Sequence, residues 1–183
     1  MCIRDRYNKI LSNQFYETNI ETLEFDKYKS FIKSENEKNE VVTEAQKSNM
    51  SNIHQSIEKS KNADDLVYFV EDDYIHQKNS LEEMIYSYEK FSTILNSELF
   101  LCPIDYPYLY FSPENTKVIL GNYSHWRKID QTLCTFLTSS KMIKKHLEKL
   151  LNMCKKEHSP FEKPLHEIFK TETCLSPIPV SYT

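Results

Sequence analysis

Glycine is almost absent from this chain. Gly121 is the single glycine in 183 residues, where ordinary usage of roughly 7% would give about 13. Walker-type phosphate loops and dinucleotide-binding turns each need several glycines at fixed spacing, because backbone N–H groups must approach the phosphates closely. The residues present therefore exclude an ATP-binding P-loop and a Rossmann cofactor site.

The remaining composition is that of one globular domain. Hydrophobic residues make up 39% and charged residues 27% of the chain, which is too apolar for a disordered protein. The net charge of −4 argues against a nucleic-acid binder, which usually carries a basic stripe. No apolar run approaches the roughly 18 residues that a membrane span needs.

The two ends of the chain resemble a translated sequencing adapter. Residues 1–6 read as a transposon-end adapter, and residues 180–183 read as its reverse complement. We expect the natural sequence to cover residues 7–179 as one incomplete domain that is open at both ends, and the terminal residues are left out of the fold prediction.

The cysteines inside this range predict no metal site. They are widely spaced and form no C-x-x-C pair, whereas zinc ribbons and redox motifs need close pairs. We expect all four to be buried, reduced thiols: Cys102, Cys134, Cys154 and Cys174.

Apolar patterning predicts alternating strands and helices. Continuous apolar runs predict strands at 66–70, 99–102, 117–120 and 133–137, and helical spacing predicts helices at 50–61, 80–95 and 140–151. Runs without polar alternation are typical of strands covered on both faces. The expected fold is therefore α/β, with a mostly parallel central sheet flanked by helices.

Three helix starts carry capping signals, and the last of them is Ser159-Pro160 with Glu162, which predicts an N-cap, a proline at the first helical position and a capping box. Ser80 and Glu83 form a Ser-x-x-Glu pattern, which predicts a capping box. Ser139 or Ser140 is predicted to cap the helix that follows the fourth strand. Behind the first signal lies an apolar stripe: Leu81, Met84, Ile85, Tyr88, Phe91 and Leu95.

Three acidic residues, Glu71, Asp72 and Asp73, directly follow the first predicted strand. Open α/β sheets bind ligands beyond the carboxyl ends of their strands. Adjacent carboxylates repel one another unless a cation offsets them, and a hard divalent ion binds carboxylates together with substrate phosphates. Alternation places Glu71 and Asp73 on one side and Asp72 on the other. The alternative is a solvated turn or helix start.

The segment around these acids resembles a known family. Residues 67–76, Val-Tyr-Phe-Val-Glu-Asp-Asp-Tyr-Ile-His, are similar to the strand and D-x-D motif of family-2-like glycosyltransferases with the GT-A fold, and most closely to a bacterial subgroup with a Glu-Asp-Asp-Tyr version. Later segments agree in the same order: 103–107, 125–127, 132–136 and 175–179.

The resemblance covers about residues 49–179 and implies a partial GT-A-like sandwich. It implies a metal-dependent transfer of a sugar from a nucleotide-sugar donor to a glycan or other hydroxyl acceptor, in bacterial polysaccharide assembly. We then expect a cytoplasmic protein, free or peripheral to the inner face of the membrane.

The same resemblance implies roles for the acidic residues. Asp73 would coordinate Mn²⁺ or Mg²⁺ on the donor diphosphate, Glu71 would lie near the donor ribose or the metal, and Asp72 would lie beside the donor. Glu71 departs from the usual first aspartate of the motif. The strand that holds the nucleotide base should lie upstream of residue 7, so we expect the isolated chain to be inactive.

Further candidates follow the acidic segment. An inverting transfer needs a carboxylate to accept the acceptor's proton, and Asp130 and Asp105 are the predicted bases, with Glu162 and Glu167 as alternatives. His76 is a candidate metal ligand or a structural histidine.

Aromatic and basic residues are predicted to contact the substrates. Tyr106 and its neighbours would stack on a sugar ring or pack at the loop base. His125, Trp126 and Arg127 are predicted to bind substrate, where Arg127 would bind phosphate bidentately or lie over an indole. Asp130 lies between them and the next predicted strand, in an expected acceptor-side loop. Two alternatives to the transferase stay open: a catalytically inactive GT-A-like module that binds a glycan or partner, and another metal–phosphate enzyme.

Overall fold

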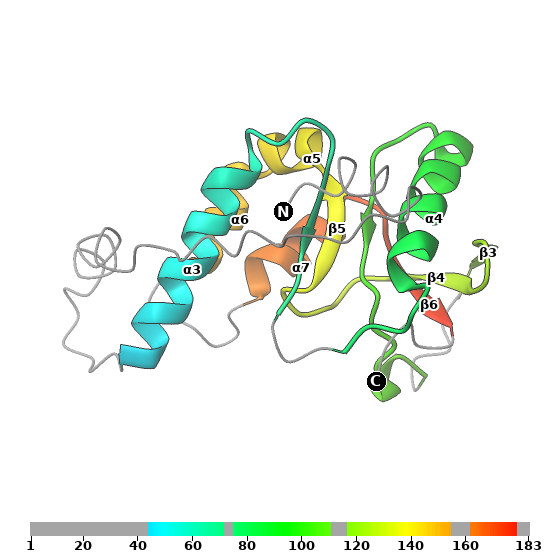
Figure 1. Cartoon of the computed structure of the whole chain (residues 1–183), viewed down its shortest axis with the longest axis horizontal. Helices are drawn as coiled ribbons and strands as arrows, with labels where there is room; N and C mark the ends of the chain where they lie inside the picture. Colours follow the sequence, from blue (N-terminus) through cyan, green and yellow to red (C-terminus); the bar gives the residue numbers. More distant parts are fainter. Residues whose placement is uncertain (1–43, 72–74, 111–116, 155–161, 179–183) are drawn as a thin grey trace.

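The computed structural model describes residues 44–71, 75–110, 117–154 and 162–178 (Figure 1). Its centre is a six-stranded sheet in the order β1-β5-β2-β6-β4-β3. The strands are β1 (Leu66–Phe69), β2 (Phe100–Leu101), β3 (Val118–Leu120), β4 (His125–Ile129), β5 (Phe136–Ser139) and β6 (Cys174–Ile178).

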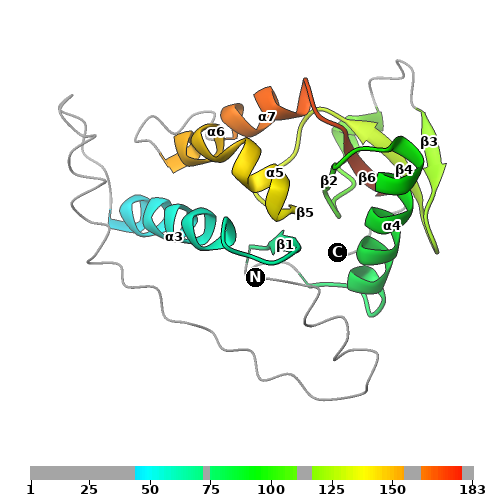
Figure 2. The same ribbon diagram turned by 90° about the horizontal axis from the view of Figure 1, so that it is seen from above.

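Helices cover both faces of the sheet. Figures 1 and 2 show α4 (Ser80–Leu95) on one side and the other helices grouped on the opposite side. That second group comprises α3 (Glu44–Ser60), α5 (Ser140–Lys145), α6 (Leu147–Leu151) and α7 (Lys163–Phe169). Short 3₁₀ turns are η1 (Pro107–Tyr110) and η2 (Asn152–Cys154).

Successive strand residues point into two separate hydrophobic cores. In β1, Val67 packs with the α3 and α5–α7 group, whereas Tyr68 packs with α4. In β2, Phe100 packs with the α3 and α5–α7 group, and Leu101 packs with α4. This is the two-residue period of a strand with both faces buried, so the expectation of covered strands in an α/β domain is confirmed.

The expectation of a mostly parallel sheet is wrong. Four of the five neighbouring pairs are antiparallel, and only β2 and β6 pair in parallel. Two of these pairs come from β5, which lies antiparallel between β1 and β2, and the other two come from β4, which lies antiparallel between β6 and β3. As a result β1, β2 and β6 still run in one direction, and their carboxyl ends face the same edge.

Two strands were not predicted. β4 contains His125, Trp126 and Arg127, which are predicted substrate-binding residues, and β6 contains Pro177. Within β6, only Cys174 and Leu175 pair with β2, so Pro177 lies beyond that ladder and its missing N–H breaks no bond to β2. In addition, β5 begins at Phe136, later than the predicted 133, and Leu133 is exposed.

Helix α4 begins at Ser80 as predicted, but the predicted capping box is wrong. The preceding Asn79 makes no side-chain cap bond, and the Ser80 hydroxyl donates to the Gln77 carbonyl at 2.9 Å. The stripe is buried from Met84 to Phe91, whereas Leu81 is partly buried and Leu95 is exposed. The cap before α5 is confirmed, since Ser139 Oγ accepts the Met142 N–H at 3.2 Å.

Glu83, the other half of the predicted box, lies buried against the turn between β3 and β4. Its Oε1 accepts the Trp126 indole N–H at 2.8 Å and the Ser87 hydroxyl at 3.1 Å. Its Oε2 accepts the backbone N–H of Asn122 at 3.1 Å and of Tyr123 at 2.7 Å. We call Glu83 and these donors the Glu83 cluster; it fastens α4 to the β3–β4 turn.

The four cysteines are buried and unbridged, as predicted. Burial raises the pKa of Cys154 to about 12, so its thiol is a packing group rather than a nucleophile. No helix within the described part of the chain is both long and apolar enough to cross a membrane.

Candidate functional site

The sheet edge at the carboxyl ends of β1 and β2 gathers several of the predicted site residues. Glu71 follows β1, Asp105 and η1 follow β2, and Thr135 comes directly before the antiparallel β5 that lies between them. Residues from three separate segments therefore meet at one edge, because β1 and β2 point the same way on either side of β5.

Glu71 is held at this edge by Thr135. The Glu71 N–H donates to Thr135 Oγ1 at 3.3 Å, and the same hydroxyl donates to Glu71 Oε2 at 3.2 Å. Glu71 is exposed and Thr135 is fully buried. A buried hydroxyl thus positions a solvent-facing carboxylate. Thr135 carried no catalytic signal of its own in the sequence, because its role depends on the pairing of β1 with β5.

The predicted metal ligands are only partly described. Asp72 and Asp73 lie outside the described residues. His76 Nε2 forms a 2.5 Å hydrogen bond with the Tyr68 hydroxyl, and the two rings meet edge to face. Within the described ranges no three His, Cys, Asp or Glu side chains form a group that could hold a metal. Glu71 supplies an oxygen ligand of the class that Mg²⁺ and Mn²⁺ bind.

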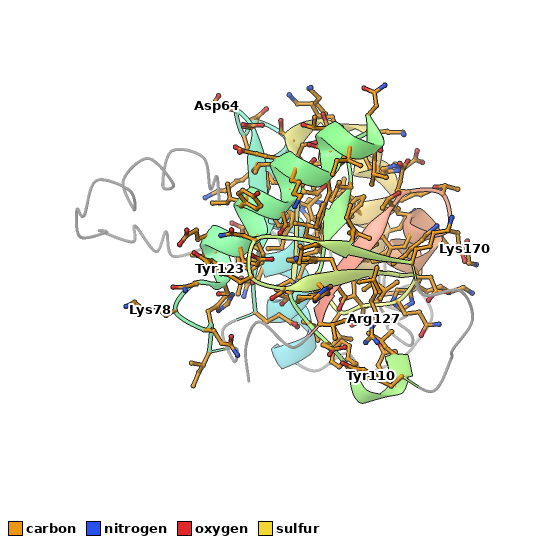
Figure 3. The ribbon with its side chains drawn as sticks, turned by 90° about the vertical axis from the view of Figure 1, so that its right-hand side faces the viewer. Asp64, Lys78, Tyr110, Tyr123, Arg127 and Lys170 are labelled. Atoms are coloured by element: carbon orange, nitrogen blue, oxygen red, sulfur yellow. The ribbon has the colours of Figure 1, made fainter. Side chains whose placement is uncertain are left out.

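Asp105 and Arg127 form a buried ion pair beside η1. Arg127 Nη2 donates to Asp105 Oδ1, both side chains are almost completely buried, and the Tyr110 hydroxyl donates to Asp105 Oδ2. The Arg127 guanidinium also lies over the Tyr110 ring, with its carbon 4.2 Å from the ring centroid. Figure 3 shows Arg127 and Tyr110 together at this end of the molecule. Asp105, a predicted base, and Arg127, a predicted phosphate ligand, are therefore bonded to each other.

The three predicted substrate-binding residues His125, Trp126 and Arg127 lie in β4 and do not share one face of the sheet. His125 is exposed at the start of the strand. Trp126 is fully buried against Phe91, and its N–H is bonded to Glu83. Arg127 turns to Asp105. Strand alternation puts Trp126 on the face opposite His125 and Arg127, so the three residues together cannot form one binding surface.

Carboxylates from other segments influence the same edge. Burial is the main cause that raises the pKa of the Cys134 thiol, and the charges of Glu162 and Glu71 raise it further. Burial likewise raises the pKa of the Tyr108 phenol, followed by Coulomb interaction with Cys102, Asp130 and Glu162. Asp130 is exposed just after β4.

The Asp105–Arg127 pair makes a testable contribution to stability. Replacing Asp105 by asparagine is expected to lower the free energy of unfolding by about 2 kcal/mol, because a buried guanidinium loses its charged acceptor. Urea unfolding followed by Trp126 fluorescence measures this loss. Asp130→Asn, an exposed control, should change stability by less than about 0.5 kcal/mol; equal losses in the two variants would contradict the role of the buried pair.

The described residues thus bring Glu71, Thr135, Asp105, Arg127 and η1 to one sheet edge, with Asp130 and Glu162 in electrostatic contact with that region. Trp126 is separate from them, in the core under α4. Comparison with protein-family models gives no match to this chain, and comparison with curated proteins gives none either.

Proposed function

We propose that the chain is part of a metal-dependent glycosyltransferase that moves a sugar from a nucleotide-diphosphate donor to a hydroxyl acceptor. The observation that carries the proposal is the position of Glu71. Glu71 is the second residue after the end of β1, and its carboxylate is hydrogen-bonded to the buried Thr135 hydroxyl. The sequence places two more carboxylates directly after it, Asp72 and Asp73.

Glu71 and Asp73 are the residues proposed to hold the cation. A bound Mn²⁺ or Mg²⁺ would neutralise the charge that develops on the leaving nucleoside diphosphate. His76 is a weaker candidate, because its Nε2 already bonds the Tyr68 hydroxyl. Thr135 is proposed as a positioning residue that keeps the Glu71 carboxylate oriented before the donor binds.

Asp130 is the better candidate for the base that receives the acceptor's proton. A general base needs an oxygen within reach of the substrate hydroxyl. Both oxygens of Asp105 accept bonds, one from Arg127 and one from Tyr110, and the side chain is buried. Asp130 is exposed and within electrostatic range of Tyr108.

Titration of the full-length protein with UDP and GDP, with and without Mn²⁺, tests the proposal. We expect Mn²⁺ to tighten nucleotide binding in the wild type, and Asp73→Ala to abolish this gain because the cation loses a ligand. Asp64→Ala is a matched control, since Asp64 is exposed at the opposite end of β1 (Figure 3). Nucleotide binding that is indifferent to Mn²⁺ would reject the metal-dependent transferase and leave the inactive binding module.

A further inference from the structure

The loop after β2, residues 102–110, carries Tyr106, Tyr108 and Tyr110, and we call it the aromatic loop. It is anchored at several points. The Ser176 hydroxyl donates to the Ile104 carbonyl, and Asp105 is paired with Arg127. Within the loop, the Leu109 N–H donates to the Tyr106 carbonyl at 3.0 Å. The Leu109 side chain packs against the core that the α3 and α5–α7 group covers. The loop therefore presents its outward side chains from a fixed backbone, which limits the entropy lost when a ligand binds.

Two tyrosines on this loop each pack their ring against a neighbouring group and are otherwise exposed to solvent. Tyr108 stacks on Tyr106, with ring centroids 5.3 Å apart and an interplanar angle of 14°. Tyr110 is supported by the Arg127 guanidinium. Even so, Tyr108 is 46% and Tyr110 56% exposed. Each ring thus has one supported face and a solvent-facing remainder.

Rings supported in this way suit the apolar faces of sugars. The face of an aromatic ring is electron-rich, and the C–H groups on one face of a pyranose are weakly positive and poorly hydrated. Stacking a sugar on a ring therefore buries apolar surface and aligns opposite partial charges, while the sugar hydroxyls stay free to form hydrogen bonds at the rim.

The charge near Tyr108 restricts which sugars fit. Apart from the buried Cys102 thiol, the groups that act electrostatically on the Tyr108 hydroxyl are the Asp130 and Glu162 carboxylates. Carboxylates accept hydrogen bonds from hydroxyl groups, and they repel phosphates and uronic acids. The region therefore favours a neutral saccharide over an anionic one.

We infer that the exposed surfaces of Tyr108 and Tyr110 form a binding subsite for a neutral saccharide. The inference rests on the proposed function, in which this saccharide is the acceptor. It lies on the β2 side of the same sheet edge as Glu71, whereas the donor diphosphate is assigned to the β1 side.

Binding of trisaccharides to the 183-residue chain, measured by saturation-transfer NMR without nucleotide or metal, tests this subsite. The probes are maltotriose and triacetylchitotriose as neutral sugars, trigalacturonate as the acidic sugar, and uridine as a free nucleoside. We expect at least one neutral trisaccharide to bind and Tyr108→Ala to weaken it about tenfold. Tyr108→Phe, which keeps the ring, should bind within about twofold of the wild type.

The control variant is Tyr123→Ala. Tyr123 is 60% exposed on the β3–β4 turn, well apart from Tyr110 in Figure 3, so its removal should leave saccharide binding unchanged. A further variant, Asp130→Asn with Glu162→Gln, should raise the affinity for trigalacturonate, because the repelling charges are gone.

Two results would overturn the subsite: a folded wild type that binds neither neutral trisaccharide, or one that binds trigalacturonate or uridine more tightly than both. The outcome is separable from that of the metal test. Saccharide binding without a Mn²⁺ effect on UDP or GDP would keep the subsite and reject the transferase, whereas the reverse pattern would keep the transferase and reject the subsite.

Discussion

Replacing Glu83 by alanine is expected to lower the free energy of unfolding by about 4 kcal/mol, because several buried donors lose their common acceptor. The carboxylate accepts the Trp126 indole N–H, the Ser87 hydroxyl and the backbone N–H groups of the turn at Asn122 and Tyr123. Glu83 itself is buried. Water entering the vacated space can satisfy some of these donors but not all of them in one geometry.

Urea unfolding of Glu83→Ala against the wild type measures the effect. A typical domain has only 5–15 kcal/mol of stability, as a rough general range, so this loss should move the transition midpoint strongly. Glu83→Gln keeps the shape and one acceptor oxygen, and we expect it to lose roughly half as much stability.

The matched control is Glu82→Ala on the same turn of α4. Glu82 accepts a 3.4 Å bond from the exposed Tyr123 hydroxyl, so its removal should cost less than about 0.5 kcal/mol. If Glu83→Ala and Glu82→Ala were equally stable, the Glu83 cluster would not be a stabilising element of the fold.

The Glu83 cluster also shows where local sequence patterns stop being informative. Ser80 and Glu83 match a capping box in spacing and residue type, yet Glu83 bonds a turn about forty residues later in the chain. A local pattern does not reveal a competing distant acceptor or donor. In contrast, Ser139 keeps its predicted cap bond to the Met142 N–H, although its hydroxyl also interacts with the distant side chains of Tyr88 and Glu98.

The strands also differ in whether local sequence predicts them or distant partners are needed. β1 and β2 were predictable because their residues are apolar on both sides and fill two cores. β4 was missed because its buried positions include Arg127, whose burial depends on Asp105 from another segment. β6 was missed because Pro177 and Ser176 look like loop residues until β2 and β4 supply their neighbours.

The direction of the sheet was the least predictable feature. A helix between two apolar runs suggests adjacent parallel strands. The two strands that α4 connects, β1 and β2, do run in the same direction, but they are not adjacent. The sequence contains no local sign that β5, much later in the chain, inserts antiparallel between them. The same insertion brings Thr135 to Glu71, so the part of the site that sequence reasoning missed has the same origin.

The single glycine, Gly121, lies directly against the Glu83 cluster. Gly121 does not adopt a positive φ, so its backbone conformation does not require glycine. A Cβ atom at this position would lie 2.6 Å from Ser87 Oγ and from Trp126 Nε1, and closer still to Glu83 Oε1. Glycine is needed here because the turn approaches three buried polar groups of the cluster.

Gly121→Ala is therefore expected to lower the free energy of unfolding by about 3 kcal/mol, since the added methyl must displace buried groups that hold one another in place. Urea unfolding measures the loss. Asn122→Ala, at the exposed neighbouring residue, keeps the backbone N–H that Glu83 accepts and should cost less than about 0.5 kcal/mol. A Gly121→Ala variant as stable as the wild type would show that the turn can move away from α4 without loss.

A double-mutant cycle between Gly121 and Glu83 separates steric overlap from general damage to the turn. In the Glu83→Ala background the closest clashing atom is gone, so adding Gly121→Ala should cost about 1–2 kcal/mol less than it does in the wild type. Part of the cost should persist, because Ser87 and Trp126 remain within 2.6 Å of the new methyl. Strict additivity would mean that the two substitutions act on independent parts of the fold, and the link between the lone glycine and the buried carboxylate would be lost.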